Sequence, residues 1–91
     1  MTQRPAAFLD RDGVLIVDSG FPHRPDQLVL TPGAAEAVKR LNAAGYVTVI
    51  VTNQSGVARG MFSEETMHDF NRRLVARLAE GGGRIDAVYA C

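Results

Sequence analysis

The chain has 91 residues, of which 46% are hydrophobic and 22% are charged, as expected for one soluble globular domain or part of one. Ten basic residues balance ten acidic residues, so no net charge attracts the chain to nucleic acid or to an anionic membrane, and an anionic ligand has to be held by a local site. The one cysteine excludes an internal disulfide, and no run is long and apolar enough for a membrane span or a signal peptide, so we expect a cytoplasmic protein.

Three apolar runs have the composition of buried strands. Residues 6–9 lead into Asp10, residues 46–51 are rich in β-branched side chains, and residues 85–90 form a third run near the end of the sequence. The first two runs are apolar on successive residues, which is typical of parallel strands that are covered on both faces. We therefore expect three strands in a parallel sheet.

Two helices are predicted between these strands. Thr31 is a candidate N-cap for the first helix, Pro32 suits the first helical position, and Gly45 suits the exit. The second helix is predicted to begin at Ser63 and to be stopped by the glycines at 81–83. Its apolar residues, which recur at three- and four-residue spacing, are Met67, Phe70, Leu74 and Leu78.

Strand, helix, strand, helix and strand in alternation predict an α/β fold, a doubly wound parallel sheet. The stretch from 14 to 30 is irregular and is expected to form a flap over the edge of the sheet. Three strands are few for this architecture, and the sequence stops right after the third. We therefore expect residues 1–91 to be the N-terminal part of a single domain whose C-terminal part is absent.

Polar residues follow the first two predicted strands, where ligands bind in open α/β sheets. Asp10 and Asp12, two residues apart at an extended strand end, are expected to point the same way, with Arg11 directed elsewhere. Two close carboxylates repel each other, and a magnesium ion relieves that repulsion. Taken alone, this Asp-x-Asp-Gly sequence is more typical of a solvated junction between a strand and a turn.

The second polar cluster is rich in hydrogen-bond donors. Thr52 offers a hydroxyl, Asn53 an amide, and Ser55 and Gly56 backbone N–H groups, all of which suit phosphate oxygens. Alone, this stretch is typical of a polar loop after a buried strand. An acidic cluster and a donor-rich cluster at the ends of two strands together favour a phosphate site.

Both clusters resemble known motifs. Residues 8–13, FLDRDG, resemble the first motif of the haloacid dehalogenase superfamily, and residues 51–56, VTNQSG, resemble its second. The longer strings FLDRDGVL and VTNQSGVARG, with a late cysteine, are similar to the D-glycero-D-manno-heptose 1,7-bisphosphate 7-phosphatases, and the histidinol-phosphate phosphatases are close relatives. The resemblance covers residues 6–91 and implies a Rossmann-like haloacid dehalogenase core and a magnesium-dependent phosphatase that acts on a small-molecule sugar phosphate.

The resemblance also implies a role for each motif residue. Asp10 would attack phosphorus and form an aspartyl-phosphate, and Asp12 would protonate the leaving alcohol and then deprotonate water. The Asp10 side chain and the Asp12 backbone carbonyl would bind Mg²⁺, and Thr52 would hold the phosphoryl group. Further substrate contacts are implied for Asp18, Ser19, Gly20, Phe21, Asn53, Gln54 and Ser55.

Cys91 corresponds to the first of four structural zinc ligands in that family. The chain holds only this one, because His23 in the flap and His68 on a helix do not fit the spacing. The superfamily's lysine and final acidic motif also fall beyond residue 91, and Lys39, on the first predicted helix, is no substitute. The resemblance therefore implies that the 91-residue chain alone is inactive and that activity belongs to a longer protein.

Three alternatives were compared with this interpretation. Histidinol phosphate is a rival substrate within the same enzyme class, and a truncated, non-catalytic fragment that binds phosphate is a rival role. A receiver module would need an acceptor aspartate at the end of a later strand, but the second predicted strand leads into Thr52 and the third into Cys91. We expect a monomer.

Overall fold

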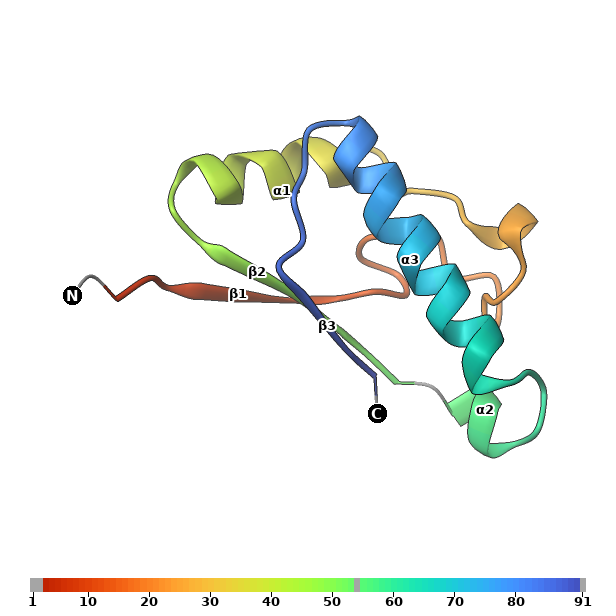
Figure 1. Ribbon diagram of the computed structural model, residues 1–91. Coiled ribbons are helices and arrows are strands. Elements are labelled where there is room, and N and C mark those ends of the chain that lie inside the picture. The colour runs from red at the N-terminus through yellow and green to blue at the C-terminus, as the bar shows by residue number, and fades with distance from the viewer. Residues whose placement is uncertain (1–2, 54, 91) are drawn as a thin grey trace.

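The computed structural model describes residues 3–53 and 55–90 of the chain (Figure 1). The predicted strands and long helices are present, whereas the 3-10 turn η1 and the short helix α2 were not predicted. In chain order the elements are β1 (Ala6–Asp10), η1 (Pro25–Gln27), α1 (Ala34–Ala43), β2 (Val47–Thr52), α2 (Ser55–Ala58), α3 (Glu64–Glu80) and β3 (Ala87–Ala90). Within the part of the chain described, no helix combines the length and the apolar character needed to cross a bilayer.

The three strands form one parallel sheet in the order β1-β2-β3. Asp10 pairs with Val51, and Thr52 pairs with Ala90, so the carboxyl ends of all three strands lie at one edge of the sheet. The strand order advances in one direction and crossover connections keep one hand, so α1 and α3 lie on the same face (Figure 1). This arrangement confirms the predicted α/β fold with a parallel sheet.

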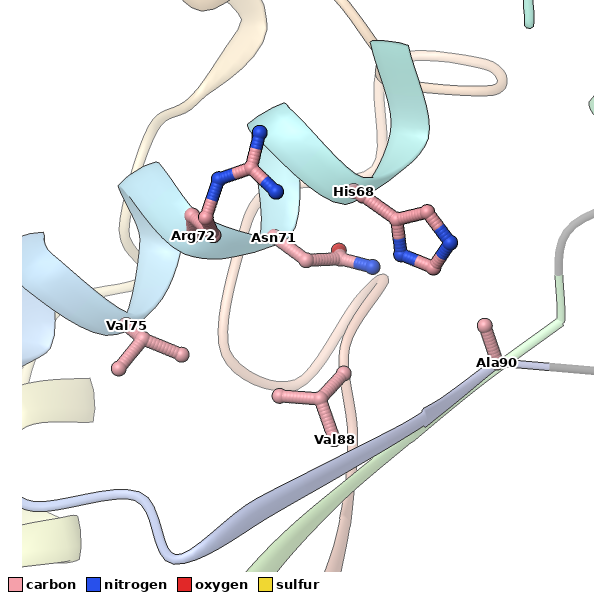
Figure 2. Close-up of a pocket in the computed structure, with 6 residues that line it drawn as sticks. All are labelled: His68, Asn71, Arg72, Val75, Val88 and Ala90. Atoms are coloured by element: carbon pink, nitrogen blue, oxygen red, sulfur yellow. The ribbon is translucent and has the colours of Figure 1, made fainter. Parts of the chain in front are cut away.

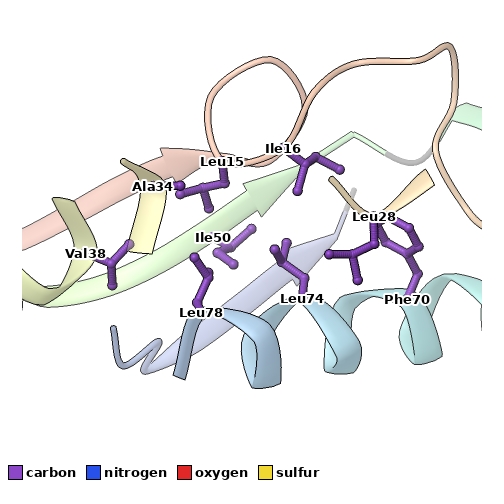
Figure 3. Close-up of a cluster of buried hydrophobic side chains, with 9 residues drawn as sticks. All are labelled: Leu15, Ile16, Leu28, Ala34, Val38, Ile50, Phe70, Leu74 and Leu78. Atoms are coloured by element: carbon purple, nitrogen blue, oxygen red, sulfur yellow. The ribbon is translucent and has the colours of Figure 1, made fainter. Parts of the chain in front are cut away.

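The core lies between the sheet and its two long helices (Figure 3). All four residues of the apolar stripe predicted on α3 are buried. The flap also contributes three core residues from its two arms, so its base is part of the packed domain. The buried cluster consists of Leu15, Ile16, Leu28, Ala34, Val38, Ile50, Phe70, Leu74 and Leu78.

The other face of the sheet does not match the expectation of burial on both sides. β2 is largely buried, but β1 alternates between exposed and half-buried residues. Phe8 of β1 is 69% exposed and Tyr89 of β3 is 62% exposed. The expectation was wrong for β1 because, among the residues that the structure describes, both long helices pack on one face of the sheet.

The start of α1 also differs from the prediction. Gly33, with φ of 81°, is the N-cap, so Thr31 and Pro32 precede the helix. The Thr31 hydroxyl is directed away from the helix and donates to the carbonyl of Val14. Thr31 therefore fastens the flap to the start of α1. At the other end Gly45, with φ of 88°, provides the predicted exit.

The ends of α3 match the prediction. Ser63 is the N-cap, and its hydroxyl oxygen accepts a hydrogen bond from the Thr66 backbone N–H at 3.1 Å. The helix ends at Glu80, directly before the glycines at 81–83. Gly83 is buried, and its N–H donates to the Leu78 carbonyl at 2.9 Å, which closes the last turn.

The flap from 14 to 30 has two arms that pair with each other. The Val17 N–H donates to the Val29 carbonyl at 2.8 Å, and Ile16 forms an antiparallel bridge with Leu30. At the tip, the Gln27 side-chain oxygen accepts hydrogen bonds from two backbone N–H groups and stabilises η1. The flap is thus a hairpin-like loop with an ordered base and a polar tip.

Candidate active site

A pocket of about 150 Å³ lies where β1 and β2 end. It brings the acidic cluster and the donor-rich cluster of the sequence together, although they are some 40 residues apart. Its lining residues are Asp10, Arg11, Asp12, Val51, Thr52 and Asn53. Because the strands are neighbours in a parallel sheet, this juxtaposition follows directly from the fold.

The two aspartates of the pocket are held differently. Asp10 is the last residue of β1 and is exposed, and its carboxylate has no hydrogen-bond or ion-pair partner among the described residues. Asp12 lies beyond the strand, in a turn whose backbone is bridged to Ile16, and its side chain is 27% exposed. The expected strand alternation therefore ends at Asp10 and does not place Asp12.

Arg11 is the residue of the pocket that sequence reasoning did not assign. Its side chain is 2% exposed and folds back onto the neighbouring carboxylate. Nε lies 2.6 Å from Oδ1 of Asp12, and Nη2 lies 3.2 Å from Oδ2. The middle residue of an Asp-x-Asp sequence was expected to point away from both aspartates, and this expectation was wrong because the extended strand ends before it.

Thr52 and Asn53 line the same pocket as Asp10. Thr52 is the last residue of β2 and is 3% exposed, and Asn53 follows it and is exposed. The central position of β2 in the described sheet fixes Thr52 between β1 and β3. A residue with a hydroxyl and a residue with an amide therefore line the same pocket as Asp10, and such donors suit the oxygens of an oxyanion such as phosphate.

The donor set of the pocket suits a hard cation only in part. Magnesium takes oxygen ligands and typically binds through one or two carboxylates together with water and phosphate. The open Asp10 carboxylate and the nearby Asp12 fit that pattern. Across residues 3–53 and 55–90 no group of three His, Cys, Asp or Glu side chains gathers to hold a metal, so a complete cage of side chains is absent from this part.

The predicted flap contacts lie outside the lining of this pocket. The Asp18 carboxylate accepts from the Gly20 N–H at 3.0 Å, and Ser19 lies 3.4 Å from the Gln27 amide. Phe21 has a positive φ of 49°, and the guanidinium of an arginine lies over its ring. The flap tip is therefore ordered by its own hydrogen bonds and by contacts to the loop that follows the second motif.

Two ring contacts connect the flap with the region after β2. The Arg59 guanidinium lies 5.3 Å from the centre of the Phe21 ring, and the His23 ring stacks on Phe62 at 4.4 Å. Ser55 begins α2, next to this contact region. Gln54 and Cys91, assigned above to substrate and zinc, lie outside the described residues.

Comparison with known proteins matches this geometry. A family profile described as haloacid dehalogenase-like hydrolase matches residues 7–73. The D-glycero-beta-D-manno-heptose-1,7-bisphosphate 7-phosphatase of Rhodopseudomonas palustris is 49% identical over 89 residues, which cover 98% of this chain and 49% of the relative. The corresponding phosphatase of Thermosynechococcus vestitus is 49% identical over 97% of this chain and 45% of its own length. The chain thus spans about half the length of the curated relatives it matches.

Solved structures show the same likeness. The D,D-heptose 1,7-bisphosphate phosphatase of B. bronchiseptica, crystallised with magnesium and phosphate, superposes with a TM-score of 0.88 at 40% identity and covers 96% of this chain and 49% of that one. A HAD-like phosphatase from Mesorhizobium loti gives a TM-score of 0.90 at 44% identity over 97% of this chain and 42% of its own. With its sheet, its Asp-x-Asp turn and its family match, the chain belongs to the haloacid dehalogenase-like hydrolases.

Proposed function

We propose that the protein containing this chain is a magnesium-dependent phosphomonoesterase that removes the 7-phosphate of D-glycero-D-manno-heptose 1,7-bisphosphate. The observation that carries the proposal is the meeting of Asp10, Asp12 and Thr52 in one pocket at the carboxyl edge of the sheet. The two heptose 1,7-bisphosphate 7-phosphatases that are 49% identical to this chain support this choice of substrate. Residues 1–91 would be the N-terminal part of the phosphatase domain, with the flap at about 14–30, in a cytoplasmic monomer.

The reaction would proceed in two displacements. The Asp10 carboxylate attacks phosphorus, an oxygen–phosphorus bond forms, and the bond to the sugar oxygen breaks while Asp12 supplies the proton to that oxygen. Asp12 then takes a proton from water, and the water oxygen displaces the phosphoryl group from Asp10 and releases inorganic phosphate. The exposed position of Asp10 supports its role as the nucleophile, because its oxygens are open to an incoming phosphate.

Other residues of the pocket would hold the phosphoryl group. The Thr52 hydroxyl and the Asn53 amide would donate to phosphate oxygens as charge develops on them, and the position of both residues in the lining of the pocket supports this. The Asp10 side chain and the Asp12 backbone carbonyl would hold Mg²⁺, which offsets the charge between carboxylate and phosphate when it is bound. The remaining proposed substrate contacts are Asp18, Ser19, Gly20, Phe21, Gln54 and Ser55.

Two parts of the proposal concern residues beyond this chain. Cys91 would be one ligand of a structural zinc site whose other ligands come from the longer protein. The 91-residue chain alone would release no phosphate, because the described residues that line the pocket include the proposed nucleophile and a hydroxyl but no lysine to neutralise the phosphorylated carboxylate. Comparison of the isolated chain with the full-length protein in one phosphate-release assay tests this expectation.

The nucleophile is tested by Asp10→Asn in the full-length protein. We expect phosphate release to fall at least about 10³-fold, since removal of an attacking side chain costs enzymes that much or more. Asp26→Asn is the matched control, because Asp26 is an aspartate of η1 whose side chain is 73% exposed and which does not line the pocket. More than a tenth of wild-type turnover in Asp10→Asn would rule out the assignment.

Substrate and intermediate need separate measurements. Heptose 1,7-bisphosphate and histidinol phosphate, tested side by side, should differ in kcat/KM in favour of the heptose. Beryllofluoride, a mimic of a bound phosphoryl group, should attach to Asp10 only when magnesium is present, as followed by ¹⁹F NMR. An adduct on any other residue would contradict the proposed intermediate.

A further inference from the structure

The Arg11 side chain is built into the domain as a fixed clamp on one carboxylate. It is 2% exposed, and it engages both oxygens of Asp12, through Nε at 2.6 Å and through Nη2 at 3.2 Å. A planar guanidinium that meets a carboxylate through two parallel N–H groups sets the plane of the carboxylate as well as its distance. The Asp12 side chain is thereby held in one orientation.

Three further contacts hold the guanidinium itself. Nη1 donates to Oδ1 of Asn71 at 3.0 Å, and Nη2 also donates to the backbone carbonyl of Pro22 at 3.2 Å. The guanidinium carbon lies 4.9 Å from the centre of the Phe70 ring. These partners come from the flap and from α3, so Arg11 cannot shift without disturbing one of them.

The hydrogen bond from Arg11 determines the orientation of the Asn71 side-chain amide. Asn71 is 5% exposed, and its Nδ2 has no hydrogen-bond partner among the described residues. Figure 2 shows this nitrogen directed into a cavity of about 360 Å³ between α3 and β3. A buried donor without an acceptor costs free energy. The opposite orientation would turn the NH₂ group toward the guanidinium, which only donates.

We infer that Arg11 is a positioning residue for Asp12, with Asn71 and the Pro22 carbonyl as its supports; the inference rests on the proposed function. General acid–base catalysis depends first on the geometry of the carboxylate relative to the oxygen that exchanges the proton. Each carboxylate oxygen retains a further lone pair beyond the one that faces Arg11. Asp12 is thus oriented and still able to meet the leaving oxygen or a water molecule.

The test separates orientation of the acid from general loss of structure. Arg11→Lys keeps the positive charge but removes the planar guanidinium that bonds both carboxylate oxygens. The activity of this variant is measured in the full-length protein with heptose 1,7-bisphosphate and with 4-nitrophenyl phosphate. Only the sugar alkoxide needs a proton to leave. We expect kcat/KM to fall by about 10- to 100-fold for the sugar phosphate, a share of what acid–base catalysis supplies, and by less than about threefold for the nitrophenyl ester.

A second variant and a control accompany it. Asn71→Ala removes one hydrogen-bond acceptor of Arg11 and leaves Asp12 unchanged. We expect its kcat/KM to fall less than that of Arg11→Lys, and again to fall more for the sugar phosphate than for the nitrophenyl ester. Arg73→Lys is the matched control and should change neither substrate, because Arg73 is an exposed arginine of α3 paired with Asp69 at 2.8 Å. Circular dichroism and thermal unfolding are recorded for each variant.

The outcomes distinguish the inference from the proposed function. Equal losses on both substrates would mean that Arg11 acts only through stability, and unchanged activity in Arg11→Lys would mean that it does not orient Asp12; either result overturns the inference. If Arg11→Lys does not fold, the substrate ratio of Asn71→Ala decides in the same way. A wild-type protein that releases no phosphate, or an active Asp10→Asn variant, contradicts the proposed function instead.

Discussion

Gly56 occupies a position where a methyl group would meet an aromatic ring. A Cβ at Gly56 would lie 2.3 Å from Cε1 and 2.6 Å from Cζ of Phe62. Carbon atoms in contact are separated by about 3.5–4.0 Å, so the ring would have to move by more than about 1 Å. That ring is stacked on His23 of the flap at 4.4 Å and 11°, so the movement would break the stacking.

The expected sign makes Gly56→Ala informative. Gly56 lies in α2, where alanine is normally favoured over glycine by up to about 1 kcal/mol. Overpacking costs about 1–3 kcal/mol, and loss of an aromatic stack costs about 0.5–1.5 kcal/mol. We therefore expect a net loss of about 1–3 kcal/mol in the free energy of unfolding, opposite in sign to the helix propensity.

A double-mutant cycle measured by urea unfolding of the full-length protein tests this reasoning. Phe62→Leu removes the ring, so Gly56→Ala in that background should cost less than about 0.5 kcal/mol or even stabilise. The two substitutions should therefore be strongly non-additive. A single Gly56→Ala variant as stable as the wild type would mean that the ring moves aside freely and that the stacking on His23 does not fasten the flap.

Two further predictions concern the pocket and the far end of the sheet. Thr52→Val keeps the shape of the buried residue but removes the hydroxyl, so kcat for phosphate release should fall by about 10²–10³-fold. Thr52→Ser keeps a hydroxyl and should retain most of the wild-type kcat. Equal activity of the two variants would exclude the hydroxyl from phosphate binding. The Thr48 backbone N–H donates to the Asp86 carboxylate at 2.8 Å, and this hydrogen bond and Arg84 hold the pKa of Asp86 below its ordinary value. The ionised carboxylate therefore stabilises the folded protein above the unfolded-state pKa near 3.9. This contribution is lost as the pH falls through the lower pKa of the folded state. Urea midpoints of Asp86→Asn should thus lie below wild type at pH 7 and converge with it on acidification below about pH 4, and a gap that does not depend on pH would contradict this.

Local patterns predicted most of the elements because each depends on nearby residues. The α3 stripe follows from three- and four-residue spacing, and Ser63 followed by acidic residues is a local cap. The start of α1 could not be predicted in this way. The Thr31 side chain could cap the helix or bond the flap, and in the structure its hydroxyl donates to the carbonyl of Val14, 17 residues away in the sequence. Competition between a local cap and a distant carbonyl is invisible in the sequence of α1 itself.

The pocket shows the same limit. The meeting of Asp10 and Thr52 follows from the parallel strand pattern alone, since neighbouring parallel strands end at one edge. The contact between Arg11 and Asn71 does not follow from the strand pattern, because the two residues are 60 positions apart. Nothing in the local sequence of α3 marks Asn71 as the partner of a buried arginine. An amide on the buried side of an otherwise apolar stripe was the one available sign that a polar group lies opposite it.

The two aspartates of one short motif therefore occupy different environments, and this difference is consistent with the roles proposed for them. Asp10 ends a strand, is exposed and has no partner among the described residues, which leaves its oxygens open to an electrophile. Asp12 lies in the turn that follows the strand, and both of its carboxylate oxygens accept hydrogen bonds from the buried Arg11. A nucleophile needs access, whereas an acid–base group needs a fixed direction, which comes best from side chains that are themselves locked by packing. Because the Pro22 carbonyl of the flap accepts a hydrogen bond from Arg11, a substrate that displaced the flap would also disturb the arginine that we infer to orient Asp12.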